Sequence, residues 1–197
     1  RSEASERVIR CDTKALAKAG AAVRANKTIA FTSRGSGGAG GSVPVASLDY
    51  PLTTMLHEMM HSWDFGDEYA YKTGEADEFC PWMVSQSVNL AAFNPARNPF
   101  ASDREARTLH RGKIPWYSAI AESTLITTSN RMGTAPGVYP ERLPAVYDAG
   151  ICVNATGAKN VATWKPYNQD TIMKRLSIDP LPWVYQWLIV RQMSAER

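Results

Sequence analysis

The spacing of its histidines is the strongest constraint on this chain. His57 and His61 are two of only 3 histidines in 197 residues, and they stand four positions apart in the segment LHEMMHSWDFGDEY. Asp49 and Pro51 precede a run of apolar residues at helical spacing, so we expect a helix over residues 51–65 with Asp49 as its cap. Residues four apart on a helix share one face, about 6 Å apart along the axis. Both imidazoles can therefore reach one metal ion.

Glu58, beside the first histidine, completes an H-E-x-x-H motif. Its place on the helix puts the carboxylate next to the ion rather than on it, where it can take a proton from water. Two imidazoles suit tetrahedral zinc, and a catalytic zinc needs a third protein ligand and an open position for water. The motif predicts one catalytic Zn²⁺ and metal-assisted amide hydrolysis, with Glu58 as general base.

Asp67 is the expected third ligand. On a continuous helix Asp67 would lie on the wrong side of His61, so the helix must end first. We expect Gly66 to adopt a left-handed conformation that reverses the chain and brings Asp67 under the metal. Glu105, in a helix expected over residues 102–110, is the alternative third ligand, as in the thermolysin-like pattern.

The remaining sequence predicts an α+β fold, read as one domain over residues 1–197. Further helices are expected over residues 12–25, 115–122 and 179–193, and short strands over 27–33 and 43–47. Pro44 lacks an N–H, which favours the edge of a sheet for residues 43–47, and an edge strand can accept an extended peptide. Residues 71–111 contain several prolines and, apart from the 102–110 helix, are expected to be mainly loop.

Composition excludes several partners. The net charge of +3 is the remainder of 22 basic and 19 acidic residues without a dense basic run, so no nucleic acid is expected. No apolar run approaches the roughly 20 residues of a membrane helix. Cys11, Cys80 and Cys152 form no CxxC pair, and one disulfide plus one free thiol is compatible with an oxidising compartment, with the pairing open. The chain opens at Arg1, compatible with removal of a leader, and we expect a secreted or periplasmic protein.

The segment HEMMHSWDFGDEY resembles the metzincin metallopeptidases, in which a third ligand, His or Asp, lies six residues after the second histidine. Asp67 holds that place. The DEY ending is similar to the bacterial family named for IgA-cleaving peptidases, whose pattern is close to HExGHxxxxLxDEY. Here Met60 replaces the glycine of that pattern, and Asp64 stands where metzincins usually carry glycine, so we expect the helix to run somewhat further.

The resemblance covers residues 27–75 and, more weakly, 137–175. It implies a zinc endopeptidase acting on protein or peptide substrates, with a small twisted sheet, an edge strand above the cleft, an active-site helix and a C-terminal helix. The segment YNQDTIMKR resembles the methionine turn of the family and places Met173 beneath the zinc. The edge strand would pair with the substrate backbone through Val43, Val45 and Ser47. Immunoglobulin as the substrate is not implied.

Some residues have weaker roles. Arg175 stands where some metzincins have a tyrosine near the metal, and we expect it to anchor a carboxylate instead. Tyr69 is expected either to donate a hydrogen bond near the metal or to pack. Glu68 is expected to cap or to form an ion pair, and His110 to face solvent. The tryptophans are expected mainly in the core, namely Trp82, Trp116, Trp164, Trp183 and Trp187.

Two other functions compete with the peptidase. A binding module on a degenerate peptidase scaffold would have no need of the base, and the intact Glu58 argues against it. A zinc hydrolase acting on a non-peptide amide satisfies the same motif.

Overall fold

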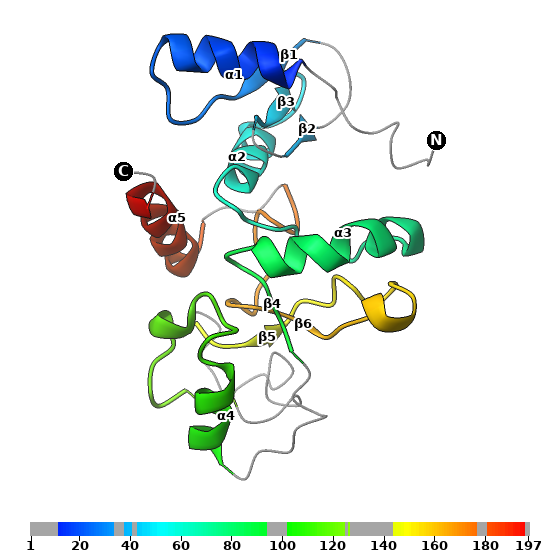
Figure 1. Cartoon of the computed structure of the whole chain (residues 1–197), viewed down its shortest axis with the longest axis vertical. Helices are drawn as coiled ribbons and strands as arrows, with labels where there is room; N and C mark the ends of the chain where they lie inside the picture. Colours follow the sequence, from blue (N-terminus) through cyan, green and yellow to red (C-terminus); the bar gives the residue numbers. More distant parts are fainter. Residues whose placement is uncertain are drawn as a thin grey trace.

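The computed structural model describes residues 12–33, 38–40, 43–93, 102–124, 126, 144–176 and 181–195. It confirms the α+β class (Figure 1). The helices are α1 (Thr13–Ala22), α2 (Leu52–His61), α3 (Thr73–Gln86), α4 (Asp103–His110) and α5 (Trp183–Ala195), with 3-10 helices at Tyr117–Ala119 and Gly157–Lys159. The strands are β1 (Ala30–Thr32), β2 (Gly38–Ala39), β3 (Val45–Ser47), β4 (Ala91–Ala92), β5 (Tyr147–Asp148) and β6 (Thr163–Lys165). Within these ranges no helix is both long and apolar enough to cross a membrane.

Two small sheets lie on either side of α3 (Figure 1). The first has the order β1-β3-β2 and lies with α1 and α2 towards one end of the molecule. The second has the order β4-β6-β5, is antiparallel throughout, and lies on the side of α3 towards α4. This arrangement separates α2 from α4 by the width of α3 and the second sheet.

The expectation that residues 43–47 form an edge strand is wrong. β3 is the central strand of its sheet, parallel to β1 and antiparallel to β2. Pro44 precedes the first paired residue, and its carbonyl accepts a hydrogen bond from the Ala30 N–H at 2.8 Å. The missing N–H of Pro44 therefore costs no hydrogen bond of the sheet.

The substrate-binding role expected for Val43, Val45 and Ser47 fails for the same reason. All three residues are buried, and the backbone of β3 is already paired on both sides. In the part of this sheet that the structure describes, the edges are β1 and β2.

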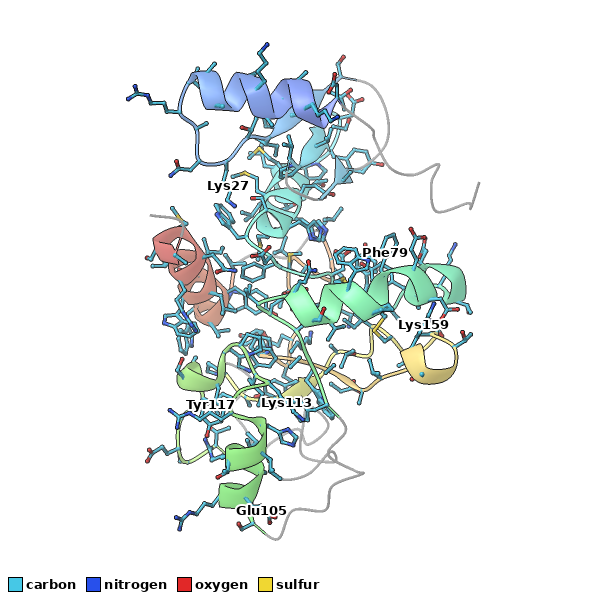
Figure 2. The ribbon with its side chains drawn as sticks, in the orientation of Figure 1. Lys27, Phe79, Glu105, Lys113, Tyr117 and Lys159 are labelled. Carbon is cyan, nitrogen blue, oxygen red and sulfur yellow. A yellow bond between two sulfur atoms is a disulfide. The ribbon has the colours of Figure 1, made fainter. Side chains whose placement is uncertain are left out.

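Helix α3 was not expected from the sequence. Pro81 lies inside it and cannot donate the helical hydrogen bond to the carbonyl of Asp77. Lys159 supplies that donor, because its Nζ lies 2.9 Å from the Asp77 carbonyl oxygen, and Figure 2 shows Lys159 beside α3. The helix tolerates its proline because a distant cation satisfies the freed carbonyl.

The core has two clusters of buried side chains. One includes Met60, Phe65 and Met173 and extends to α5, and the other surrounds Cys80 and Cys152 beneath α3. Trp116 and Trp164 are buried as expected, and each donates its indole N–H to a backbone carbonyl at 2.6 Å. Trp82 and Trp183 are about half exposed, with fractions of 50% and 49%. The expectation of a core role is wrong for these two.

Two further local expectations are wrong. His110 is buried rather than solvent-facing, because its ring stacks on Phe93 with centroids 4.1 Å apart. The segment 115–122 forms only the 3-10 turn Tyr117–Ala119 instead of an α-helix.

We predict that the disulfide stabilises the fold appreciably. Cys80 and Cys152 are bonded across a sequence separation of 72, whereas Cys11 lies outside the described residues. Closing a loop of this size reduces the entropy of the unfolded chain and typically contributes about 2–4 kcal/mol. The double substitution Cys80→Ala with Cys152→Ala should lower the unfolding free energy by that amount in urea denaturation. Reductant should shift the wild-type midpoint but not that of the double variant, and an unchanged wild-type midpoint would contradict the prediction.

Candidate functional site

Helix α2 carries the histidines and ends earlier than expected. It begins at Leu52 with Pro51 in the cap position and no side-chain cap, so Asp49 does not have the expected capping role. It ends at His61, and the chain reverses at Asp64, whose φ of 61° is left-handed. Aspartate tolerates this conformation better than most residues because its short side chain can bond locally.

Gly66 is not the residue that turns the chain, contrary to expectation. Asp64, rather than Gly66, has the positive φ in this segment. Gly66 is instead needed for a close approach, because an added Cβ would lie 2.4 Å from Ser87 Oγ and 2.5 Å from Leu90 Cδ1. The turn is therefore supplied two residues earlier than we expected, with the same consequence for Asp67.

Backbone carbonyls orient both imidazoles. His57 Nδ1 lies 2.9 Å from the Ile172 carbonyl oxygen, and His61 Nδ1 lies 2.8 Å from that of Phe65. A carbonyl oxygen can only accept, so each Nδ1 is the protonated nitrogen and donates. In the neutral rings this leaves a lone pair on each Nε2. The two Nε2 atoms lie 3.2 Å apart.

Asp67 completes a triangle with the two rings. Its Oδ1 lies 3.1 Å from His57 Nε2 and 3.4 Å from His61 Nε2. With neither Nε2 protonated, the buried Oδ1 accepts no hydrogen bond from the described residues. The three facing atoms are then all electron-pair donors, an arrangement that a bound cation or a shared proton would stabilise.

The dimensions of the triangle fit zinc. Ligand atoms at about 2.0–2.1 Å from a tetrahedral zinc lie about 3.3–3.4 Å from one another, close to the distances between the two Nε2 atoms and Oδ1. The donor set of two imidazoles and one carboxylate is also one that zinc accepts. His57, His61 and Asp67 therefore form a candidate metal centre.

Two tyrosines hold the other oxygen of this carboxylate. Tyr69 donates its hydroxyl to Asp67 Oδ2 at 2.9 Å, and Tyr71 donates to the same atom at 2.5 Å. Burial raises the pKa of both phenols, so they remain protonated donors. Since Oδ2 is occupied in this way, Oδ1 is the atom presented to the histidines. Of the two roles expected for Tyr69, the structure favours the hydrogen bond.

The pKa values of His61 and Asp67 are shifted by burial and by the short distance between the two side chains. Burial lowers the pKa of His61, but its hydrogen bond with Asp67 and that residue's charge outweigh burial and raise the pKa to about 9. Burial likewise raises the pKa of Asp67, and the hydrogen bonds with His57 and His61 overcome it and bring the pKa well below its ordinary value. The Asp67 carboxylate and the His61 imidazole therefore each stabilise the charged form of the other.

Glu58 is buried next to the triangle. A carboxylate oxygen of Glu58 and a ring nitrogen of each histidine lie within 4.8 Å of one another. Burial raises the pKa of Glu58, and the neighbouring histidines oppose part of that rise. The Glu58 carboxylate thus lies beside the two imidazoles, in a group of side chains that could hold a metal ion.

Two glycines of the first sheet cover these side chains. A Cβ at Gly38, in β2, would lie 2.4 Å from Glu58 Oε1, and a Cβ at Gly40 would lie 2.3 Å from His61 Cδ2. Only a backbone without side chains can approach the helix this closely. Gly38 and Gly40 therefore pack directly on Glu58 and His61.

Glu68 is buried in a network that fixes the segment carrying Asp67. Its Oε1 accepts hydrogen bonds from Asn89 Nδ2 at 3.0 Å and from the Tyr185 hydroxyl. Its Oε2 accepts one from Thr171 Oγ1 at 2.8 Å and pairs with Lys165 Nζ at 3.4 Å. The ion pair expected for Glu68 is present, but the sequence did not indicate that it would be buried among four partners.

Asn89 is a site residue that the sequence analysis missed. Its side-chain amide accepts from the Gly66 N–H at 2.8 Å and donates to the Gly66 carbonyl at 2.9 Å. The residue before Asp67 is therefore held at both backbone groups. No short-range pattern points to Asn89, because it lies 23 positions away from Gly66.

Met173 belongs to a segment whose backbone contacts the site. It is fully buried, its carbonyl accepts a hydrogen bond from the Glu68 N–H at 2.9 Å, and the preceding carbonyl orients His57. Arg175 pairs with Asp170 at 2.9 Å, the anchoring of a carboxylate that we expected. The turn thus contacts both the histidine helix and the Asp67 segment.

The structure does not bring Glu105 to the histidines. It lies exposed on α4, which Figures 1 and 2 show at the opposite end of the molecule from α2. The thermolysin-like alternative therefore has no geometric support, because the second sheet and α3 stand between α4 and the histidines.

We predict that removing the Glu68 carboxylate destabilises the protein strongly. Glu68→Ala leaves the buried ammonium of Lys165 without its counter-charge, which typically costs about 3–5 kcal/mol. Chemical denaturation should show this loss, whereas Glu78→Ala, at an exposed position of α3, should change stability by less than about 0.5 kcal/mol. Adding Lys165→Met to Glu68→Ala should restore part of the stability, since the unpaired charge is then absent. Equal stability of Glu68→Ala and Glu78→Ala would refute the role of the network.

No known protein-family model matches the sequence, and no curated protein matches it. The function of the chain must accordingly be argued from the convergence of His57, Glu58, His61 and Asp67.

Proposed function

We propose that this protein is a zinc-dependent endopeptidase of metzincin type. The observation that carries the proposal is the convergence of His57 Nε2, His61 Nε2 and Asp67 Oδ1 within 3.4 Å, with the Glu58 carboxylate beside them. These three residues would hold one zinc ion through one nitrogen or oxygen each. A three-ligand set leaves a position for water, which is typical of catalytic rather than structural zinc.

Each residue of the site would have its own role in hydrolysis. When bound, the zinc would lower the pKa of a water molecule and polarise the carbonyl under attack. Glu58 would take a proton from the attacking water and pass it to the leaving amine. Tyr69 and Tyr71 would keep Asp67 in place through its second oxygen.

Several features support the metzincin-type assignment. The third donor follows the second histidine by six residues, and the backbone of the segment around Met173 bonds to His57 and Glu68. The Cys80–Cys152 disulfide supports a secreted or periplasmic location, because such bonds persist in oxidising compartments.

The main-chain contact with substrate is best assigned to β2. This strand is an edge of its sheet, and its Gly38 lies against Glu58. An extended peptide that adds to β2 would pass close to the base.

One test of the proposed function concerns Glu58, the proposed general base. Glu58→Gln should retain one zinc per chain but lose hydrolysis of a peptide substrate by a factor of about 10²–10⁴, because the amide has no basic oxygen for the proton. Metal analysis and a fluorogenic peptide assay check the two parts. Glu105→Gln, an exposed and distant change, serves as the control with full activity. Retained proteolysis in Glu58→Gln would exclude the mechanism, and zinc binding without hydrolysis in the wild type would favour a binding module.

Another test of the proposed function concerns Asp67, the proposed third ligand. Asp67→Ala should lower zinc affinity by more than about 100-fold, because the triangle loses its only negative donor. Tyr71→Phe should lower it by about 10–100-fold through loss of the hydrogen bond that orients the carboxylate. Competition with a chelating dye measures both values. Glu105→Ala should bind zinc like the wild type, and release of the metal by that variant instead would reverse the assignment.

A further inference from the structure

We propose that an aromatic row beside the site, formed by Tyr69, Tyr71, Phe79 and Trp82, binds an aromatic or large apolar side chain of the peptide substrate. This inference rests on the proposed peptidase function and names the substrate class of the same site.

The four rings form a continuous series of contacts. The ring centroids of Tyr69 and Tyr71 lie 5.2 Å apart, those of Tyr71 and Phe79 5.5 Å, and those of Phe79 and Trp82 6.0 Å. Edge-to-face and tilted pairs at these distances are favourable. The row therefore continues from the chain segment after Asp67 onto α3.

The row begins at the candidate metal centre. The hydroxyls of Tyr69 and Tyr71 both donate to Asp67 Oδ2. Figure 2 shows Phe79 on the side of α3 that faces α2 and β2. A peptide lying across the metal centre would thus have these rings next to it on the side of α3.

Two members of the row leave apolar surface open to solvent. Tyr69 is 39% exposed and Trp82 is 50% exposed, while Tyr71 is buried behind them. Exposed aromatic surface next to a catalytic group is a typical place for a ligand side chain, because rings offer a large contact area and lose little conformational entropy.

The backbone that carries the row is held in place by a disulfide and by hydrogen bonds. Cys80, which lies on α3 between Phe79 and Trp82, is bonded to Cys152. The Tyr71 N–H donates to the Ile151 carbonyl at 3.3 Å, and the Tyr71 carbonyl accepts from Asn154 Nδ2 at 2.6 Å. Preorganised rings lose less entropy when they bind a partner.

The test measures peptide binding separately from cleavage. The probe is a pair of extended peptides that differ by Phe or Ala at one position, with that position scanned along the peptide, and the protein is zinc-loaded Glu58→Gln, which cannot turn them over. Calorimetry should give about tenfold tighter binding of the Phe peptide at one position. Trp82→Ala in this background should reduce that preference to less than about twofold, and Trp82→Phe should keep most of it.

Trp183→Ala is the matched control, because Trp183 is 49% exposed but lies on α5. It should leave the preference for Phe unchanged, and zinc content should be the same in all variants. The inference is wrong if no position shows a preference for Phe, or if Trp82→Ala and Trp183→Ala behave alike. Cleavage by the otherwise wild-type chain without such a preference would overturn this inference and leave the peptidase proposal intact. A Trp82-dependent preference for Phe in a protein that cleaves no peptide would support this inference and overturn the peptidase proposal.

Discussion

The buried carboxylate of Glu68 is the interaction on which the rest of the structure depends. Asn89, Thr171 and Tyr185 donate to it and Lys165 pairs with it, and these partners come from three separate stretches of the chain, at residues 89, 165–171 and 185. A carboxylate removed from water must be compensated in this way to be tolerated. The residue before it supplies the third side chain of the candidate site. The position of that side chain is therefore set by contacts between distant parts of the sequence, and the candidate site can form only when those parts are in contact.

This dependence explains which parts of the site could be predicted from the sequence. The histidines and the base lie on one helix, where spacing alone determines their relative positions. Asp67 was identified because it follows closely, but the turn that delivers it was assigned to Gly66 rather than Asp64. The glycine was misread because its actual role is a contact with Ser87 and Leu90, which local sequence does not contain. Apart from Tyr69, the hydrogen-bonding partners of the site were missed for the same reason.

In the fold too, the elements set by local sequence were predicted, and those that depend on distant residues were not. The amphipathic helices followed from periodicity, whereas α3 was overlooked because Pro81 normally interrupts a helix, and its compensation by Lys159 comes from 82 positions away. The strand after Pro44 was assigned to an edge on a sound local rule, but the proline falls just before the paired residues, so the rule did not apply. Propensity describes what a residue does alone. In α3 another segment satisfies the carbonyl that Pro81 leaves unpaired, whereas Pro44 lies outside the paired residues and leaves no group of the sheet unpaired.

The two sides of the site differ in what they can recognise. On the side of β2, Gly38 and Gly40 present bare backbone that packs on Glu58 and His61, and any side chain there would displace the side chains of these two residues. Such a surface can distinguish an extended main chain but not one side chain from another. On the side of α3, the aromatic row presents rings and no backbone edge. If a peptide lies between them, its main chain is held from one side and its side chains are selected from the other. Under the proposed function, substrate preference should then change through substitutions on α3, while Gly38 and Gly40 stay fixed by their contacts with Glu58 and His61.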